Sequence, residues 1–473
     1  MNPAALQTLS PLTRRLLPLL WTLAVLPFLT LGYGGDDDAW RVAEAARKIW
    51  ETGHYVSSRT TGFPLLEILA APLIHFGQWY LSNLIGWAGG LFLLLGFVKL
   101  AEQEALQHPL WTVVLLAFHP LILKNGSSTM DYLPALALLL WGYIYLMQGR
   151  WGVYGVLVGL ACGFRPSSGL FVLAGMYAHW RAGGRIKQIG AIYLTALGVG
   201  ALAFSPSLLT YGIPTSVEPM AFPPRLVLLM GGYNFLTFLG VLGSLLVWPL
   251  LAWRWGECAL RGIPAGLKPF YGYHAVTLLV GFLLYAKMPL EPEYLLPVLP
   301  SVILLLDRLL SRKELMLVAA VLLSYHVVHV ETLGGESGAR RIALGLGSGY
   351  TPRDVRERLF YLSTRELADN LRVDRPTVLF FGDAWIPANN PKWQRDEATG
   401  GFRQKDGQFI IAQPILNREA LAKLHAQNYR LILWKGRKFE FTYSGLSGWE
   451  HYVEVVDSLE EVLGGPILGR PRQ

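Results

Sequence analysis

The chain has 473 residues, of which 52% are hydrophobic and 16% are charged, and its mean hydropathy is +0.36. This composition is too apolar for a soluble globular protein and is typical of a protein with several transmembrane helices. The net charge of +8 resides in arginines and lysines of short loops, so it does not indicate a nucleic-acid partner. The two cysteines, Cys162 and Cys258, lie in a hydrophobic segment and a basic loop, which excludes a disulfide framework.

The first hydrophobic segment follows Arg14 and Arg15 and reaches about Tyr33. Because no small-x-small cleavage site stands out, we expect a retained first helix rather than a signal peptide. A membrane span needs about 20 apolar residues, or fewer where helices are broken inside a bundle, and about eleven spans are predicted on this basis. They lie near residues 16–33, 80–98, 110–123, 132–147, 151–164, 167–179, 187–205, 233–252, 270–286, 294–309 and 314–331.

Basic residues recur in alternate loops of this predicted topology. The groups are Arg14/Arg15, Lys99, Arg150, Arg181–Lys187, Arg254–Lys268 and Arg308–Lys313. Since basic loops stay in the cytoplasm, we expect a protein of the plasma (inner) membrane with a cytoplasmic N-terminus. The outer side then receives the loops 34–79, 124–131, 206–232 and 287–293, the corner at Arg165 and the chain after about 332.

The outer loop 34–79 is predicted to contain helices of its own. Apolar residues recur at helical spacing from Ala39 to Trp50, and Gly53 ends this helix. The segment Pro64–Phe76 is apolar but interrupted by a glutamate, a proline and a histidine. It is too short to span a membrane, so we expect it to lie along the interface.

The composition changes at the end of the last predicted span, where charges become dense. The predicted strands and helices after this point are Thr377–Phe381, Arg430–Trp434, Arg353–Leu371 and Asn417–Gln427. Their alternation predicts a membrane domain over 1–331 and an extracytoplasmic α/β domain over 332–473. The second domain lacks a glycine-rich phosphate-binding fingerprint.

Three consecutive aspartates, Asp36, Asp37 and Asp38, follow the first hydrophobic segment. Like charges this close repel one another, which raises the pKa of at least one carboxyl group. Such a cluster suits a catalytic base, a cation path or a divalent metal, because Mg, Mn and Ca prefer oxygen ligands. A solvated acidic loop is the plain alternative. We expect no required cofactor, and a metal at Asp36–Asp38 stays open.

The other strong polar candidates of the membrane domain also fall on the outer side. They are Arg41, Arg59, Glu67, His75, Lys124, Asp131, Arg165, Arg225, Lys287, Glu291, Glu293 and Tyr294. Ionisable groups at membrane depth indicate function, and cations at the headgroup level suit a lipid phosphate. In plainer alternatives, Arg41 pairs with Glu44 or the aspartates, and Asp131 caps a helix. Arg165 would then be a snorkelling side chain, and Tyr294 an interfacial aromatic.

The segment from Asp38 to Gly53 reads D-A-W-R-V-A-E-A-A-R, with T-G at its end. It resembles, without gaps, the first outer loop of GT-C class glycosyltransferases, namely lipid A aminoarabinose transferases and protein O-mannosyltransferases, which reads roughly D-E-x-R-x-A-x-x-A-R. The resemblance implies that Asp38 activates an acceptor hydroxyl and that Arg41 approaches the phosphate of a polyprenyl-phosphate sugar donor. Ala39 departs from the family's glutamate. Asp37 can supply that acid, so which aspartate is the base stays open.

Three further motifs extend the resemblance over roughly residues 15–310. The T-M-D ending at Asp131 is similar to a T-x-D at the outer end of a span, which implies a second functional acid. A G-L-A segment leads to Arg165 where the family has a lysine near the carrier phosphate. Tyr294 opens Y-L-L-P, which implies a tyrosine that faces the donor. The resemblance implies a polytopic α-helical GT-C fold with a C-terminal outer soluble domain.

Sugar transfer from such a donor needs one base for the acceptor proton and cations for the departing phosphate. We therefore predict a membrane glycosyltransferase, a hexosyl- or pentosyltransferase expected to invert, with a lipid, glycan or protein acceptor. The predicted substrate-binding residues are Arg59, Glu67, Lys124, Glu291 and Glu293. The alternatives are a transporter or flippase of a lipid-linked or anionic substrate, against which the lack of paired interrupted repeats counts, and a catalytically silent relative.

Overall fold

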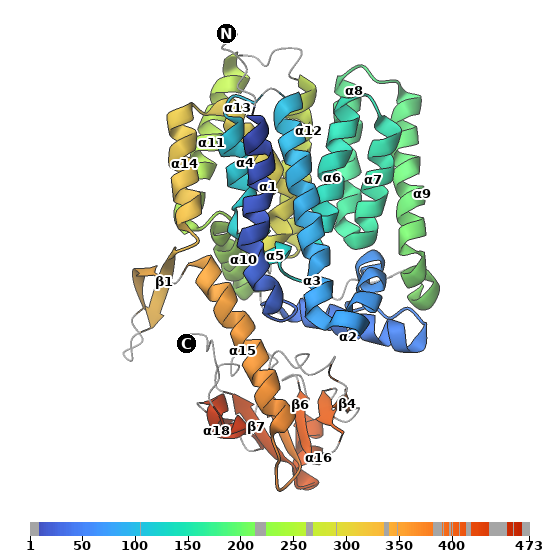
Figure 1. Ribbon diagram of the computed structural model, residues 1–473, viewed down its shortest axis with the longest axis vertical. Coiled ribbons are helices and arrows are strands. Elements are labelled where there is room, and N and C mark those ends of the chain that lie inside the picture. The colour runs from blue at the N-terminus through green and yellow to red at the C-terminus, as the bar shows by residue number, and fades with distance from the viewer. Residues whose placement is uncertain are drawn as a thin grey trace.

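The computed structural model describes residues 9–104, 106–212, 224–261, 268–289, 291–334, 340–347, 349–381, 390, 392–396, 399, 401–405, 407–412, 418–434, 452–456 and 458–465. A bundle of long helices makes up most of the molecule. A smaller domain with a β-sheet lies at the end of the bundle opposite the start of α1 (Figure 1).

The bundle is built from fourteen described α-helices. They are α1 (Pro11–Val25), α2 (Asp37–Thr52), α3 (Pro64–Gln103), α4 (Pro109–Ala117), α5 (Pro120–Gly126), α6 (Tyr132–Met147), α7 (Trp151–Phe164), α8 (Val172–Arg181), α9 (Ile186–Tyr211), α10 (Pro224–Phe238), α11 (Val241–Arg261), α12 (Lys268–Lys287), α13 (Leu299–Leu309) and α14 (Arg312–Ser324). Three short 3-10 helices adjoin them: η1 (Leu26–Thr30), η2 (Pro166–Phe171) and η4 (Pro292–Val298). Several elements, α3, α4 and α5 among them, begin with proline, which lacks the N–H group that a first helical turn leaves unbonded anyway.

Four described helices are long and apolar enough to cross a membrane: Pro11–Thr30, Pro64–Gln103, Ile186–Tyr211 and Pro269–Lys287. The bent pair α10–α11 would be a fifth if it forms one span. The other predicted spans appear as shorter apolar helices, such as α6 and α7, or as two helices joined by a break. The prediction of a multi-pass helical membrane protein is therefore confirmed, although many of its spans are short or interrupted.

Two of the predicted spans differ from the structure in their course. The span at 233–252 is broken, because α10 and α11 meet at an angle of 82°. Gly240 stands at this break with a φ of +73°, a left-handed conformation that glycine adopts readily. The span at 314–331 is too long, since α14 ends at Ser324 and strand β1 (Val328–Gly334) follows. Its valines extended the apolar run without extending the helix, which is the usual ambiguity of β-branched residues in short apolar runs.

Helix α2 lies across the end of the bundle nearest the C-terminal domain (Figure 1). Asp36 is its N-cap residue, and Gly53 ends it with a φ of +67°, so the predicted helix and its end are confirmed. The predicted interfacial segment Pro64–Phe76 is the first part of α3. Gln78 has non-helical backbone angles (φ 50°, ψ −135°), which kink α3 just after that segment.

A bulky side chain that packs against glycines holds the first helix, α1, against α3 and α5. Trp21 of α1 is fully buried. A Cβ atom placed on Gly90 of α3 would lie 2.4 Å from the Trp21 ring, and one on Gly126 of α5 would lie 2.7 Å from it. Side chains at these two glycines would therefore push α1 away from the helices that lead to the candidate site.

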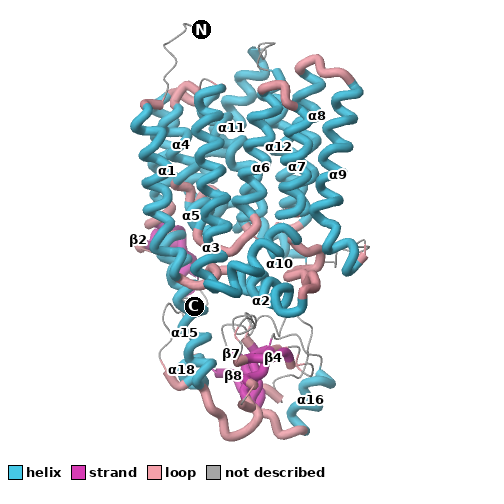
Figure 2. Tube along the Cα trace, turned by 45° about the vertical axis from the view of Figure 1, so that its right-hand side comes forward, coloured by secondary structure: helices cyan, strands magenta, loops and turns pink. Residues whose placement is uncertain are grey.

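The C-terminal domain begins with a β-hairpin and a long helix. Strand β1 pairs antiparallel with β2 (Arg340–Leu346), and α15 (Tyr350–Asn370) leads away from the bundle (Figures 1 and 2). A six-stranded sheet follows in the order β4-β5-β6-β3-β7-β8. Its strands are β3 (Thr377–Phe380), β4 (Trp393–Arg395), β5 (Phe402–Gln404), β6 (Phe409–Ala412), β7 (Arg430–Trp434) and β8 (Glu454–Val456), with helices α16 (Arg418–Ala426) and α18 (Leu459–Leu463).

The central strand β3 is parallel to β6 and β7, as an α/β domain requires. All four residues of β3 are buried, as are the last four of β7, so both are core strands. The two strands and two helices predicted in this domain are confirmed to within a few residues. Of the strands in this sheet that were not predicted, β6 has four residues and β4, β5 and β8 have only three each, too few for a period-two pattern to show in the sequence.

Candidate functional site

A continuous ladder of ion pairs lies where α2 crosses the end of the bundle. Arg59 Nη1 donates to Asp38 Oδ2 at 2.6 Å, and Arg59 Nη2 donates to Asp131 Oδ1 at 3.0 Å. Arg165 Nη1 donates to the other oxygen of Asp131 at 2.7 Å. The exposed fractions are 9% for Asp38, 0% for Asp131 and 6% for Arg165. Residues from four separate segments, predicted independently as site residues, are thus joined in one buried network.

Local structure fixes both carboxylates of this ladder. Asp38 lies in the first turn of α2, where its N–H donates to Asp36 Oδ1 at 2.9 Å. Asp131 precedes α6 but makes no side-chain capping bond, so the plain capping alternative is excluded. Its turn is held by Thr129, whose N–H donates to the Tyr33 carbonyl and whose hydroxyl donates to Asn83 Oδ1 at 2.8 Å.

Glu67 holds the loop that carries Arg59. Its buried carboxylate accepts hydrogen bonds from the Tyr55 hydroxyl, from the N–H and hydroxyl of Ser58, and from the Phe63 N–H at 2.9 Å. Arg59 itself stacks on the Phe63 ring at 3.6 Å. The observed contacts of Glu67 are therefore those of a loop anchor, and its predicted contact with substrate stays a prediction.

Arg165 lies among aromatic rings rather than at the lipid boundary. Its guanidinium carbon is 4.0 Å from the centre of the Tyr132 ring and 4.9 Å from that of Tyr294. The snorkelling alternative is therefore wrong, because the side chain is buried and paired. Tyr132 in turn donates its hydroxyl hydrogen bond to Glu291 Oε2 at 3.0 Å. This contact extends the network from the ladder to the loop before η4.

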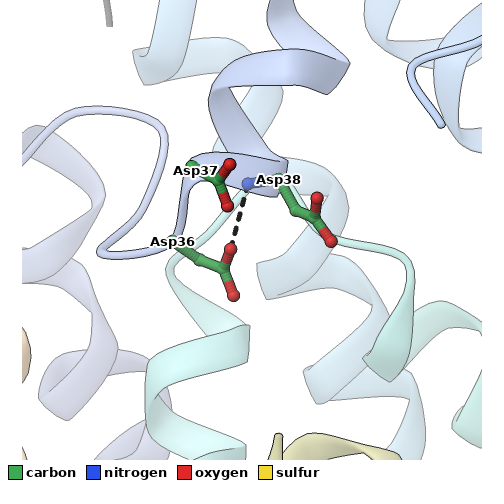
Figure 3. Close-up of side chains that lie close together, drawn as sticks. All are labelled: Asp36, Asp37 and Asp38. Atoms are coloured by element: carbon green, nitrogen blue, oxygen red, sulfur yellow. Dashed lines mark hydrogen bonds between the residues drawn. The ribbon is translucent and has the colours of Figure 1, made fainter. Parts of the chain in front are cut away.

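Figure 3 shows the aspartate cluster, in which the three side chains lie close together at the start of α2. Asp37 pairs with Arg41 at 2.7 Å, so the plain alternative for Arg41, pairing with the aspartates, is observed. One carboxylate oxygen from each of Asp36, Asp37 and Asp38 lies within 4.8 Å of the others, which is compatible with a divalent cation. The same carboxylates bind Arg41, Arg59 and a backbone N–H. A metal there stays a prediction.

A polar cavity of about 190 Å³ adjoins this cluster. Its walls include Asp36, Lys124, Glu291 and Glu293 from the membrane domain. Lys124 Nζ lies 2.8 Å from Glu293 Oε1. The structure therefore gathers Lys124, Glu291 and Glu293, three predicted substrate-binding residues, around one space. The membrane-domain walls also include Tyr233, Asn234 and Thr237 of the bent helix α10.

The part of the cavity wall that α15 contributes was not predicted from the sequence. Tyr350, Arg353, Asp354 and Glu357 line the cavity, and the Tyr350 hydroxyl donates to Glu293 Oε1 at 3.0 Å. These residues lie more than 50 positions beyond Glu293 in another domain. Their spacing at i, i+3, i+4 and i+7 places them on one helix face. The helical spacing of these four residues can be seen in the sequence, but the surface that they face cannot.

Burial and neighbouring charges shift the pKa values of the acids at this site in opposite directions. Burial, reinforced by the charges of Glu291 and Asp38, raises the pKa of Asp36 well above its usual range. Burial together with Asp38 and Glu293 raises the pKa of Glu291 to about 7. Burial alone would also raise the pKa of Asp131, but Arg165 and Arg59 outweigh it and lower that pKa. Asp131 is therefore stabilised as an anion that holds two arginines, whereas the environment of Asp36 and Glu291 disfavours their ionised forms.

The raised pKa of Glu291 predicts a pH dependence of stability. A carboxyl group whose pKa rises on folding contributes stability below its unfolded pKa, near 4.5, and loses it as the pH rises through about 7. Asp36 acts in the same direction. The unfolding temperature of the detergent-purified parent should therefore fall between pH 5 and pH 8, because Glu291 titrates between about 4.5 and about 7. In the Glu291→Gln variant this fall should be smaller. An unchanged pH profile in the variant would contradict the assigned shift.

Comparison with solved structures gives the fold of nearly the whole chain. No protein-family model and no curated protein matches the sequence. The crystal structure of ArnT from Cupriavidus metallidurans bound to undecaprenyl phosphate is similar, with a TM-score of 0.51 and 13% sequence identity, over 95% of this chain and 90% of ArnT.

Two further solved structures are matched at lower similarity. The apo state of the same ArnT has a TM-score of 0.48 and 14% identity, over 79% of this chain and 83% of ArnT. The oligosaccharyltransferase of Archaeoglobus fulgidus, in complex with Zn and sulfate, has a TM-score of 0.43 and 12% identity, over 79% of this chain and 61% of that protein.

The likeness to undecaprenyl-phosphate-bound ArnT, a GT-C lipid A aminoarabinose transferase, extends over nearly the whole of both chains. This protein therefore has the GT-C fold that its motifs predicted.

Proposed function

We propose that the protein is a glycosyltransferase that moves a sugar from a polyprenyl-phosphate donor to an acceptor hydroxyl at the outer face of the membrane. One observation carries the proposal: a carboxylate, Asp38, and two guanidinium groups, the half-buried Arg59 and the buried Arg165, belong to one ion-pair ladder at one end of the bundle. Transfer from a sugar phosphate needs these two kinds of group together. The orientation proposed from the basic loops places this end outside the cytoplasm.

Asp38 has the geometry of a base with one oxygen held and one available. Oδ2 accepts the bond from Arg59, whereas Oδ1 lies 4.0 Å from Arg41 Nε, beyond hydrogen-bond distance. In the proposed step, Oδ1 takes the proton from the acceptor hydroxyl as its oxygen attacks the anomeric carbon. The bond from that carbon to the phosphate oxygen breaks, and polyprenyl phosphate leaves with the electron pair. A single displacement of this kind inverts the anomeric configuration.

Cations on the other side of Asp38 are suited to the departing phosphate. Arg59 Nε has no hydrogen-bond partner among the described residues but is covered by neighbouring atoms, so we propose that the donor phosphate displaces this cover to accept its hydrogen bond. Arg165 and Arg41 are the further candidates, and Tyr294 lies beside Arg165. We propose Asp131 as the residue that positions Arg59 and Arg165, because both of its oxygens are engaged by them. Its assignment as a catalytic acid stays a prediction.

The ArnT structure contains undecaprenyl phosphate, which supports a donor carried on a polyprenyl phosphate in this protein. The direct test is a transfer assay in proteoliposomes with a panel of polyprenyl-phosphate sugars and envelope extract as the source of acceptor. Release of polyprenyl phosphate that depends on acceptor supports the proposal. Translocation of intact donor across the bilayer without release would favour the flippase alternative instead.

Arg165 provides a separate test of donor binding. We expect Arg165→Ala to weaken binding of undecaprenyl phosphate by about tenfold or more, since a charge-assisted hydrogen bond contributes roughly 1.5–3 kcal/mol. The measurement is binding of labelled lipid to purified protein by microscale thermophoresis. Arg150→Ala, at the opposite end of α7 and exposed, is the matched control. Equal affinity of Arg165→Ala and the parent would remove Arg165 from the phosphate site.

A further inference from the structure

A cation without an acidic partner lies where α15 leaves the helical bundle. The guanidinium carbon of Arg365 is 5.8 Å from the centre of the Trp40 ring and 5.5 Å from that of Trp79. Within the described part of the chain, no ion pair or hydrogen bond joins Arg365 to another residue. Its Nη1 atom is enclosed without a partner, but the side chain as a whole is only half-buried, so an anion can approach its other nitrogens.

The acid one helical turn after Arg365 is engaged elsewhere. The carboxylate of Asp369 accepts hydrogen bonds from Trp393 Nε1 at 2.6 Å and from Asn390. Burial lowers the pKa of the Arg365 guanidinium, and the nearby Tyr33 and Asp369 offset this effect only in part. A cation that is partly desolvated in this way is stabilised by an anion that comes from outside the chain.

The contact with Trp79 places Arg365 at the level of the lipid headgroups. Trp79 follows Gln78, whose backbone angles kink α3. The part of α3 after this kink, residues 79–103, is apolar and long enough for a membrane span, which needs about 20 residues. Trp79 and its exposed neighbour Tyr80 therefore stand at the start of the span, where such aromatic residues gather at the membrane interface.

An exposed, largely apolar stripe runs along α3 from Tyr80 into the span. Its residues are Tyr80, Leu84, Ala88, Phe92 and Leu95, and all five are exposed. They follow one another at spacings of three or four residues, which places them along one face of the helix. An acyl chain can therefore lie along this face, with its headgroup beside Trp79.

We propose that Arg365 and Trp79 bind the phosphate of an anionic phospholipid whose acyl chain lies along the exposed stripe of α3. The phosphate oxygens accept charge-assisted hydrogen bonds from the guanidinium. The Trp79 indole N–H, which is enclosed without a partner among the described residues, is a further donor once a phosphate lies beside it. The lipid ties α15 to α2 and α3, because Arg365, Trp40 and Trp79 belong to these three helices.

This phospholipid is distinct from the sugar donor of the proposed function. Trp40 lies two residues after Asp38, so their side chains leave α2 roughly 200° apart. Asp38 faces the ladder with Arg59, whereas Trp40 faces Arg365 on the other side of the helix. A phosphate bound at Arg365 therefore cannot present a sugar carbon to Asp38, and the inference does not depend on sugar transfer.

The test locates the bound lipid by photo-crosslinking. Full-length protein is placed in nanodiscs of phosphatidylcholine with a trace of phosphatidylglycerol that carries a diazirine at the start of one acyl chain. After illumination, adducts on residues 79–84 are quantified by peptide mass spectrometry. Unlabelled phosphatidylglycerol in place of about a sixth of the phosphatidylcholine should halve these adducts. This share corresponds to a preference of about fivefold for an anionic headgroup, as expected from one arginine at the membrane surface.

The matched variants remove one positive charge each. Arg365→Gln should lower the adduct yield about fivefold. Arg372→Gln, at an exposed position just after the end of α15, should keep the yield of the parent. The competition between the two phospholipids is measured on the parent protein, so it does not depend on how well either variant folds.

Equal adduct yields in Arg365→Gln and the parent would overturn the proposal. So would adducts that fall only in proportion to dilution when phosphatidylglycerol replaces phosphatidylcholine. Glycerol 3-phosphate at millimolar concentration should leave the adducts unchanged, because it has no acyl chain; displacement by it would show a site for a free phosphate instead. Displacement by undecaprenyl phosphate at a lower share than phosphatidylglycerol would assign the site to the donor lipid.

Discussion

Replacement of Asp38 by asparagine should abolish sugar transfer while the protein accumulates at its normal level. Asparagine keeps the size of the side chain and its hydrogen bond to Arg59, but it accepts no proton. Loss of a sole general base typically reduces rate by ~10²–10⁴-fold. The measurement is acceptor-dependent release of polyprenyl phosphate in proteoliposomes, with quantitation of the purified variant to exclude loss of protein.

The neighbouring aspartate is the matched control for this result. Asp37 pairs with Arg41 in the same turn of α2, with 26% of its side chain exposed. Asp37→Asn should therefore retain most of the activity, with a moderate rise in KM if Arg41 contacts the donor. The opposite pattern, an inactive Asp37→Asn and an active Asp38→Asn, would transfer the role of base to Asp37. Full activity of both variants would refute a carboxylate base in this cluster.

The second large effect is expected at Arg358, which is fully buried where α15 meets the bundle. Its guanidinium donates to Asp354 Oδ2 at 2.8 Å, to the Ser127 carbonyl at 2.9 Å and to the Ser128 hydroxyl at 2.7 Å. The first two contacts neutralise a buried acid and satisfy a carbonyl just after the end of α5. Breaking one partner of such a buried pair costs about 3–5 kcal/mol.

We therefore expect Arg358→Ala to lower the unfolding temperature in detergent by several degrees and to reduce transfer activity. Arg356→Ala is the control, because Arg356 lies two positions away and makes an exposed hydrogen bond to the Gly347 carbonyl. Asp354→Ala combined with Arg358→Ala should be less destabilising than Arg358→Ala alone, since no buried charge is then left unpaired. If Arg358→Ala and Arg356→Ala unfold at the same temperature, the buried contacts contribute little.

Most of the helices and the first outer loop could be predicted from the sequence, because their signals are local. The helix after Asp36 has a cap, a helical apolar period and a terminal glycine, and all three are found in α2. The break between α10 and α11 could not be predicted in this way. The sequence stays apolar on both sides of Gly240, so composition does not mark the bend. The bend depends instead on packing against other segments of the chain. One example is Tyr325, whose ring would lie 2.8 Å from a Cβ atom placed on Gly240.

The candidate site was predicted in its residue types but not in its connections. Asp38, Asp131 and Arg165 were each assigned from separate motifs, and the structure joins them through Arg59, which was predicted to bind substrate only because of its location on the outer side. Arg358 was missed altogether. Its i, i+4 pair with Asp354 has the same spacing as a solvated surface pair. Only its contact with a turn 231 positions away shows that it is buried.

The course of α15 has a consequence for how the helical bundle and the C-terminal domain depend on each other. Because this helix roofs the space beside Asp36 and inserts Arg358 into the turn before α6, the C-terminal domain is a structural component of the helical bundle. A fragment ending near residue 331 would keep every motif that the outer loops share with GT-C enzymes. It would nevertheless leave the carbonyls after α5 open to water and the cleft beside the aspartates without its lid. Grafting the tail of another enzyme onto this bundle would meet the same obstacle unless the roofing helix were retained.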